Sequence, residues 1–261
     1  MLNQIQHNKN TMTKDIFGKA LLDYQNDNYS EDIITWTNIS DKDELPLPYL
    51  FRTYSEMPKL EQKALQLSKG KILDVGCGAG NHALWLQEKG FNVKAIDSSK
   101  GAIEVCELRG LKNAEHIALL EETDTFDTIL LLMNGTGIFQ EIIQVAKYLN
   151  HLKTLLKPNG QILIDSSDIS YMYEDEDGGT WLDLNSGYIG ELDYFFSYKG
   201  EEETPMKWLY LDFETLNTAC QTVGLKCEKI MDGEHFDYLA RIRLKETYWN
   251  IKIYSCSNRF T

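Results

Sequence analysis

Basic side chains are scarce in this 261-residue chain, which has 26 Lys and Arg against 40 Asp and Glu and a formal net charge of -14. Proteins that bind nucleic acid neutralise phosphates with clustered Lys and Arg. The sequence contains no basic stripe of this kind. The charge balance therefore predicts no nucleic-acid partner or substrate.

Cysteine is also sparse, and its spacing lacks the patterns of disulfide frameworks and zinc sites. The five cysteines are odd in number and form no C-x-x-C pair: Cys77, Cys106, Cys220, Cys227 and Cys256. Reduced, cytoplasmic thiols are expected. The acidic run 174–177 lacks the Asp-x-Asp-x-Asp-Gly spacing of a calcium loop, so a solvated loop and no metal are expected there.

Long hydrophobic runs are absent as well. The N-terminal stretch MLNQIQHNKN has no apolar segment of the kind found in signal peptides. The longest purely apolar run, Ile129 to Met133, is far short of the roughly 20 residues that a membrane span needs. We expect a cytoplasmic protein with no membrane partner. Because 43% of its residues are hydrophobic, a chain of this length can bury a full core.

The strongest local pattern lies in residues 71–97. An apolar run, 72–75, stops at a turn with glycine at every second position, namely Gly76, Gly78 and Gly80. A helical pattern follows, and a second apolar run then stops at Asp97. Strand, glycine turn, helix, strand and acid form a βαβ unit suited to a nucleotide-like ligand at the carboxyl ends of its strands.

The glycine spacing departs from the G-x-G-x-x-G pattern of dinucleotide-binding folds. An acid, Asp74, stands two residues before the first glycine. A pyrophosphate favours a helix N-terminus without a nearby carboxylate, whereas a ligand that carries an ammonium group gains from an acid at this turn. The turn therefore indicates a ligand with a positive charge.

Strand and helix patterns alternate over most of the chain. Further strands are expected near 114–119, 126–133, 161–165, 225–231 and 236–244, and further helices near 58–67, 99–108, 142–156 and 216–223. Such alternation is typical of an open α/β sheet. It breaks between 169 and 213, where period-two alternation in 192–198 and 206–210 predicts an inserted β-hairpin.

Four segments in order resemble one family. LDVGCGAG closely resembles motif I of class I S-adenosylmethionine-dependent methyltransferases, and Asp97, 21 residues after Gly76, matches the acid that ends the family's second strand. FDTILLLMNG is similar to the strand-four region, and LLKPNGQILID to the junction before strand five. The resemblance covers about residues 70–168 and continues plausibly at 208–244.

The resemblance implies an enzyme with a Rossmann-like α/β fold and S-adenosyl-L-methionine as its cofactor. The fold would be a doubly wound, mostly parallel seven-stranded sheet with an N-terminal helical cap and an inserted antiparallel β-hairpin. The expected parts are an N-terminal cap or lid (1–69), the cofactor-binding core (70–168 and 208–244), the inserted hairpin cap (169–207) and a tail without interpretable pattern (245–261).

The resemblance also assigns roles to individual residues. Gly76 and Gly78 would let the backbone approach the methionine portion, Asp74 would face its ammonium group, and Asp97 would accept both ribose hydroxyls. The family's adenine-binding acid has no clear match in 115–122, where Glu121 or nearby backbone groups would serve. The implied cofactor-binding residues are Asp74, Gly76, Cys77, Gly78, Gly80, Asp97, Ser98, Ala118, Leu119, Met133 and Asn134.

Methyl transfer from a sulfonium requires positioning and desolvation, and a general base only if the acceptor must lose a proton. Among the histidines, His82 and His151 are expected to be structural because they lie on helices. His235, between the last two strands, is the candidate catalytic base, with an ordinary loop histidine as the alternative. Arg52 is expected in a surface ion pair, although it could instead meet a carboxylate of the ligand.

The acceptor class is narrowed by two missing motifs. The sequence has neither the Asn/Asp-Pro-Pro-Tyr-like motif of nucleic-acid amino methyltransferases nor the Pro-Cys nucleophile of cytosine C5 enzymes. A small-molecule acceptor is therefore expected, in a monomer or homodimer, with a protein methyltransferase, a cofactor-binding domain without transfer, and a nicotinamide oxidoreductase as alternatives. Aromatic residues that could line the acceptor pocket, or form the core of the cap, are Tyr49, Phe51, Tyr54, Tyr171, Tyr173, Trp181 and Tyr194.

Overall fold

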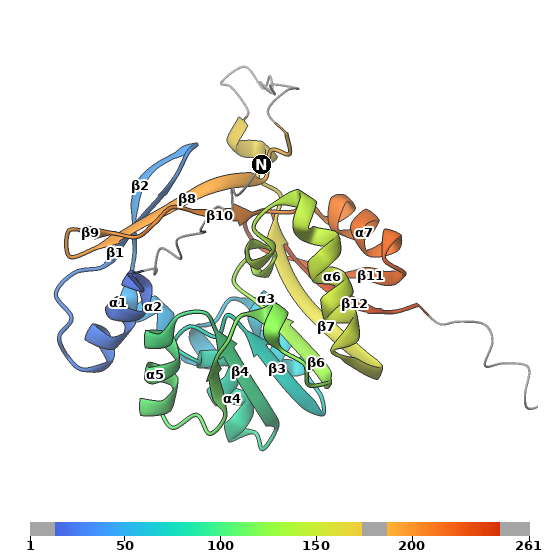
Figure 1. Ribbon diagram of the computed structural model, residues 1–261, viewed down its shortest axis with the longest axis horizontal. Coiled ribbons are helices and arrows are strands. Elements are labelled where there is room, and N and C mark those ends of the chain that lie inside the picture. The colour runs from blue at the N-terminus through green and yellow to red at the C-terminus, as the bar shows by residue number, and fades with distance from the viewer. Residues whose placement is uncertain (1–13, 174–186, 246–261) are drawn as a thin grey trace, which may run out of the picture.

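A computed structural model describes residues 14–173 and 187–245, which form two β-sheets with flanking helices (Figure 1). The helices are α1 (Ile16–Gln25), α2 (Leu47–Leu50), α3 (Lys59–Leu67), α4 (Asn81–Glu88), α5 (Lys100–Leu108), α6 (Val145–Thr154) and α7 (Phe213–Thr222). The strands are β1 (Ile33–Thr37), β2 (Ser40–Leu45), β3 (Lys71–Val75), β4 (Asn92–Asp97), β5 (Ala114–His116), β6 (Phe126–Leu131), β7 (Leu156–Ser167), β8 (Glu191–Tyr198), β9 (Glu201–Glu202), β10 (Met206–Leu209), β11 (Leu225–Asp232) and β12 (Asp237–Leu244). Short 3₁₀ helices are η1 (Tyr54–Glu56), η2 (Leu119–Glu121), η3 (Gly135–Phe139), η4 (Ile142–Gln144) and η5 (Ser170–Tyr173).

The larger sheet has seven strands in the order β11-β12-β7-β6-β3-β4-β5. The five strands from β7 to β5 are parallel, whereas β12 runs antiparallel to β7 and β11 antiparallel to β12. The predicted mostly parallel, seven-stranded and doubly wound sheet is therefore confirmed. Because the carboxyl ends of parallel strands meet at one edge, the residues that follow β3, β4, β5 and β6 lie along the same side of the molecule.

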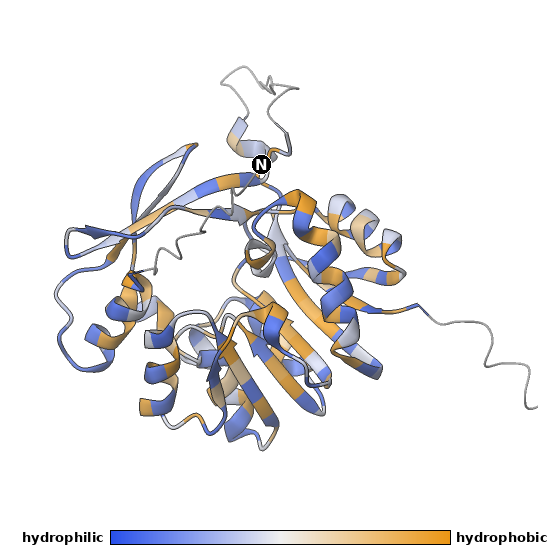
Figure 2. Cartoon of the chain, in the orientation of Figure 1, coloured by the Kyte–Doolittle hydropathy of each residue, from blue (hydrophilic) through white to orange (hydrophobic). Residues whose placement is uncertain are grey.

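Both faces of this sheet are covered by helices, which explains the apolar runs without alternation. On one face Leu73 and Ile129 pack with residues of α6 and α7, and on the other Ile72 and Leu130 pack with residues of α3, α4 and α5. These strand side chains have no exposed surface. Figure 2 shows the sheet interior as a hydrophobic band between helices with hydrophilic outer faces.

One helix boundary differs from the sequence expectation. The helix expected to run to residue 156 ends at Thr154, and the Lys157–Gly160 stretch expected to stop it lies inside β7 instead. Neighbouring β6 explains the difference, because Phe126 pairs with Leu156 before a register shift that leads to the Thr128–Gln161 pair. A ready strand partner extends β7 across residues whose local preference is for a turn.

The smaller sheet joins segments that are far apart in the sequence. Strands β8 and β10 pair antiparallel, as the predicted hairpin requires, but β8 also pairs with β1, giving the order β10-β8-β1-β2 with β9 beside β8. The N-terminal region thus contributes the hairpin β1–β2 in addition to the expected helices. Alternation did not reveal β2 because its sequence, SDKDEL, is polar and mostly exposed, as suits an edge strand (Figure 2).

A third apolar cluster attaches the smaller sheet and α1 to the glycine-turn side of the core. It combines Leu21 of α1, Ile33 of β1 and Phe196 of β8 with Ala79 and Val105. The N-terminal region is therefore packed against the segment that the sequence singles out. Within residues 14–173 and 187–245, no helix has the length and apolar character to cross a membrane.

Candidate cofactor and acceptor site

The glycine turn follows β3 and is held by its neighbour β4. The Gly76 N–H donates to the Ile96 carbonyl at 2.9 Å, and the Cys77 N–H donates to the same carbonyl at 3.2 Å. All three glycines of the turn have positive φ, with values of 69° at Gly76, 52° at Gly78 and 83° at Gly80. Residues with a Cβ rarely adopt this conformation, so the turn requires glycine.

Two of these glycines have different surroundings. A Cβ on Gly78 would meet nothing within 4 Å, so the backbone there borders open space. A Cβ on Gly80 would lie 2.8 Å from the Cys106 Sγ atom of α5, so this glycine allows α4 and α5 to approach closely. The side chain of Cys77 is buried at 3.7 Å from the same sulfur and points away from any open surface.

Asp97 lies at the end of β4 and binds the glycine turn. Its Oδ2 atom accepts the Gly78 N–H at 2.9 Å, and its Oδ1 atom accepts the Ser99 N–H at 2.8 Å. Burial raises the pKa of Asp97, and the two N–H donors oppose this shift. Each oxygen keeps a second lone pair, so the carboxylate can still accept two hydroxyl groups.

Asp74, on β3, is 2% exposed. Its Oδ2 atom has no hydrogen-bond partner among the residues that the structure describes. Burial raises the pKa of Asp74, and the nearby charge of His82 lowers it. A buried carboxylate oxygen without a donor is costly, so this atom marks a place where a ligand donor fits.

The residues after β4 and β5 form the next part of the same edge. Ser98 is exposed, and its carbonyl accepts the His116 Nε2–H at 2.9 Å. The Ala118 N–H donates to the Glu121 Oε2 atom at 2.9 Å, and Leu119 is buried. From the sequence, Glu121 and the nearby backbone are alternative partners for adenine. In the structure these two groups are hydrogen-bonded to each other.

Met133 and Asn134 form an unusual turn after β6. Their φ values are 66° and 60°, a conformation that is uncommon outside glycine. Asp165, at the end region of β7, stabilises this turn by accepting the Met133 N–H at 3.1 Å and the Gly135 N–H at 2.9 Å. Asn134 is half-buried and its Oδ1 atom accepts the Ser166 hydroxyl at 3.1 Å.

A cavity of about 270 Å³ opens beside this turn. Its wall combines the ends of β6, β7 and β12 with residues from α2 and α3. The lining residues are Tyr49, Pro58, Leu60, Glu61, Met133, Asn134, Asp165, Ser166, Ser167 and Asp237. We call it the acceptor pocket, for the candidate role that its predicted cofactor residues Met133 and Asn134 suggest.

Asp165 and Glu61 are pocket residues that the sequence analysis did not select. Burial raises the pKa of Asp165 to about 6, with the backbone donors of the β6 turn opposing the shift. The signal for Asp165 was present, since it is an acid near the end of a buried strand, as Asp97 is. Glu61 gave no such signal, because a charged residue in an amphipathic helix is usually solvated.

The predicted aromatic lining is only partly found at this pocket. Of the aromatics named above, Tyr49 is a lining residue, and burial raises its pKa. Tyr54 stacks on Trp85, and Tyr171 stacks on Phe236. Trp181, like the acidic run 174–177 and most of the tail, lies outside the described residues.

The structure places three basic residues that the sequence analysis considered for the site, one exposed and two buried. His235 lies in the β11–β12 turn with its side chain exposed, and it is absent from the pocket wall, which its neighbour Asp237 reaches. His82 and Arg52 are buried, and both contact Glu61. The expectation of a surface ion pair for Arg52 was wrong, because α3 places Glu61 beneath it and the pair is covered.

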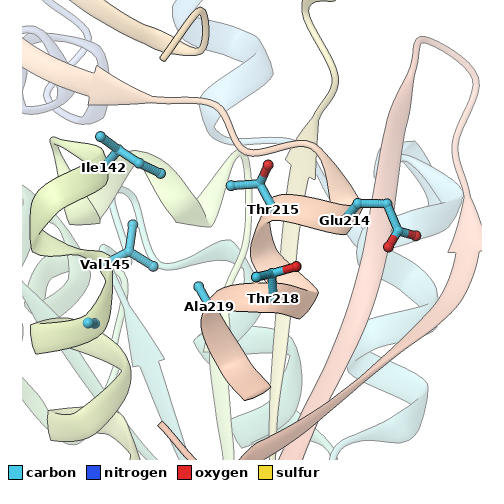
Figure 3. A pocket seen from close by; sticks show the side chains of 7 residues that line it. Ile142, Val145, Glu214, Thr215, Thr218 and Ala219 are labelled. Atoms are coloured by element: carbon cyan, nitrogen blue, oxygen red, sulfur yellow. The ribbon is translucent and has the colours of Figure 1, made fainter. Parts of the chain in front are cut away.

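Another hollow, of about 420 Å³, lies between α6 and α7. Figure 3 shows Ile142 and Val145 on one side and Thr215, Thr218 and Ala219 on the other. None of the predicted site residues lines it. Across the part of the chain that the structure describes, no group of three or more His, Cys, Asp or Glu side chains is placed to hold a metal ion.

A family model described as a methyltransferase domain matches residues 49–229 of this chain. The crystal structure of an S-adenosylmethionine-dependent methyltransferase from Bacteroides fragilis, in complex with S-adenosyl-L-homocysteine, is 43% identical and superposes with a TM-score of 0.83. That match covers 88% of this chain and 95% of the other. The chain belongs to the S-adenosylmethionine-dependent methyltransferases. The family predicted from the sequence is therefore confirmed.

More distant relatives agree with this family over a shorter stretch. A ubiquinone biosynthesis O-methyltransferase of Rickettsia prowazekii is 31% identical over 115 residues, which are 41% of this chain and 44% of that protein. The chain thus spans less than half the length of the first curated relatives it matches. The CcbJ methyltransferase of Streptomyces caelestis, 15% identical over 73% of this chain and 94% of its own with a TM-score of 0.57, shares the fold.

Proposed function

We propose that this methyltransferase binds S-adenosyl-L-methionine at the glycine turn and transfers its methyl group to a small molecule in the acceptor pocket. The observation that carries the proposal is that three residues lie together at one edge of the sheet. The open backbone at Gly78, the carboxylate of Asp97 and the unpartnered Oδ2 atom of Asp74 adjoin one another there.

These residues fit the parts of the cofactor by their chemistry. The unpartnered oxygen of Asp74 suits the ammonium group, because a buried carboxylate gains most from a cationic donor. The free lone pairs of Asp97 suit the two ribose hydroxyls, and the missing Cβ at Gly78 leaves room for the chain between them. When bound, S-adenosylmethionine supplies a methyl group on a positively charged sulfur, which is already a good leaving group.

The protein's task is then to orient the two partners and exclude water. The Met133–Asn134 turn lines the acceptor pocket, and Asp165 holds it through two backbone hydrogen bonds. Asp165 also lines the pocket, and its pKa of about 6 lets it accept a proton from an acceptor near neutral pH. Asp165 is therefore a better-placed base than the exposed His235.

The small size of the pocket supports a small-molecule acceptor over a protein. A volume of about 270 Å³ lies just below the usual range for drug-sized ligands, about 300–1,000 Å³. We further propose that the described parts of the N-terminal cap and the inserted hairpin (14–69, 169–173 and 187–207) act together as a lid, since β1 and β8 share one sheet and Tyr49 lines the pocket.

Two measurements test this function. S-adenosyl-L-homocysteine should bind the full chain in calorimetry, and S-adenosylmethionine should be consumed with a panel of hydroxylated and amino metabolites. Binding without turnover across a broad panel would favour a cofactor-binding domain without transfer. Binding of NADH without binding of S-adenosylhomocysteine would refute the proposal. Asp165→Asn should lower the rate of methyl transfer if the acceptor loses a proton in the reaction.

A further inference from the structure

Four buried ionisable side chains connect the acceptor pocket with the glycine turn. The Arg52 Nη2 atom donates to both carboxylate oxygens of Glu61 at 2.5 Å. His82 Nε2 lies 2.7 Å from Glu61 Oε2, and His82 Nδ1 lies 4.0 Å from Asp74 Oδ1. The first three contacts are hydrogen bonds, and the last is an ionic contact. We call these residues the buried relay: Arg52, Glu61, His82 and Asp74.

The relay comes from four separate parts of the chain, and its member Asp74 is on β3. Glu61 is on α3, His82 is in the first turn of α4 after the glycine turn, and Arg52 lies just after α2. None of the four residues is more than 7% exposed. Glu61 also lines the acceptor pocket, so the relay begins at the pocket wall and ends at the predicted ammonium partner, Asp74.

The charges in the relay support one another. Burial raises the pKa of Glu61, but contacts with His82 and Arg52 outweigh this and lower it overall. Burial lowers the pKa of His82, but its hydrogen bond to Glu61 and the charges of Asp74 and Glu61 outweigh burial and the opposing charge of Arg52. His82 therefore tends to keep its proton, and its charge opposes the burial that raises the pKa of Asp74 overall.

We propose that Arg52, Glu61 and His82 are positioning residues that hold the Asp74 carboxylate ionised and aimed at the ammonium group of the cofactor. Within residues 14–173 and 187–245, Asp74 is the one member of the relay with a buried carboxylate oxygen that lacks a partner. A buried acid in this position protonates easily unless a nearby cation opposes it. The proposal rests on the proposed function, because it assigns a role within the same cofactor site.

This role predicts a specific dependence of cofactor binding on pH. The cofactor's ammonium group binds ionised Asp74 better than neutral Asp74. Replacing His82 by Gln removes the cation that lowers the pKa of Asp74, so a higher pH is needed to ionise this acid. A nearby opposite charge shifts a carboxyl pKa by about 1–3 units. The pH profile of binding should shift upward by about one unit or more in the variant.

The experiment is calorimetric titration of S-adenosyl-L-homocysteine into the full chain between pH 5.5 and 9. His82→Gln should bind more weakly than the wild type at the acid end of this range, by up to about tenfold for each unit by which the pKa of Asp74 rises, and should approach wild-type affinity at the alkaline end. Asp127→Asn is the matched control, because Asp127 is also ion-paired, with Lys157 Nζ at 2.8 Å, but lies at the start of β6, away from the carboxyl ends of the strands. It should keep the wild-type pH profile.

The outcomes separate this proposal from the proposed function. If the wild-type chain binds and His82→Gln loses affinity equally at all pH values, or keeps the wild-type profile, the positioning role is refuted. If the wild-type chain binds at no pH, the proposed function itself is refuted. Should His82→Gln fail to fold, NMR of the wild-type histidine nitrogens decides. His82 should be protonated at pH 6.5 in the free chain. Adding S-adenosylhomocysteine should lower the pKa of His82, because the ligand brings a second positive charge close to it. A neutral His82, or one whose pKa does not change, would overturn the proposal.

Discussion

At the residue scale, acids near strand ends organise the site through backbone donors. Asp97 binds the N–H groups of Gly78 and Ser99, and Asp165 binds those of Met133 and Gly135. Each carboxylate thus fixes a turn whose backbone conformation is otherwise rare. The same acids keep lone pairs that a ligand can use, so under the proposed function turn formation and ligand binding rely on one set of residues.

Asp97→Ala should weaken S-adenosyl-L-homocysteine binding by more than tenfold. The variant removes two charge-assisted hydrogen bonds to the ligand, each worth about 1.5–3 kcal/mol, together with the acceptor that orients Gly78. Calorimetry of the folded variant measures this loss. Asp232→Ala is the control, because Asp232 also ends a strand but is exposed and pairs with Lys229 alone in the described structure. Wild-type affinity in Asp97→Ala would remove Asp97 from the site.

At the element scale, the close approach of α1 and α5 attaches the N-terminal region to the core. A Cβ on Gly101 of α5 would lie 2.6 Å from the backbone of Gly18 in α1. Asp15, the N-cap of α1, accepts the Gly18 N–H and also the Gly101 N–H, at 3.1 and 2.8 Å. The helices therefore share a cap residue, and glycine at both positions permits the contact.

Gly101→Ala should separate α1 from α5 and lower the free energy of unfolding by about 1–3 kcal/mol, as overpacking of close contacts does. Chemical denaturation measures the total effect, and hydrogen exchange should show faster exchange in residues 16–25. Glu104→Ala, on the exposed face of α5, should change stability by less than about 0.5 kcal/mol. Unchanged exchange of α1 in Gly101→Ala would contradict this account of the interface.

At the scale of the whole molecule, buried ionisable side chains make stability depend on pH, and one of them opposes the others. The folded pKa of Asp165, about 6, exceeds its ordinary value of 3.8, so the native state binds this proton more tightly than the unfolded state does. The raised pKa of His82 acts in the same sense. The pKa of Glu61 is lowered, so the native state binds this proton less tightly than the unfolded state does, and stability falls when the pH is low enough to protonate Glu61.

Stability should therefore rise as the pH falls from 8 to about 4.5 and then decline. His82 contributes stability below about pH 6.5 that is lost as pH rises through its folded pKa. Asp165 adds up to about 3 kcal/mol between pH 6 and 4, and Glu61 loses its contribution as pH falls below about 4.5. Urea unfolding across pH 4–8 measures the profile, and Asp165→Asn should flatten the rise. Greater wild-type stability at pH 8 than at pH 5.5 would contradict the assignment.

Much of the fold and the glycine turn could be predicted because their signals are local. Glycines that need positive φ, an acid at the end of a buried strand and apolar runs without alternation each reflect constraints on neighbouring residues. The family, the seven-stranded sheet and the grouping of Asp74, Gly78 and Asp97 at one sheet edge follow from such signals and from their order along the chain.

Other features depend on contacts between distant segments, and only the tertiary structure decided them. The polar strand β2 forms because β1 pairs with it and with β8, which lies more than 150 residues further along the chain. The buried relay forms because α3 places Glu61 against Arg52 and His82, and nothing in the helical pattern of 58–67 indicates a buried acid. By itself the sequence determined the glycine turn, because the backbone conformation there, with positive φ at three positions, requires glycine. The walls of the acceptor pocket come from five separate regions of the chain, and long-range packing alone brings them together.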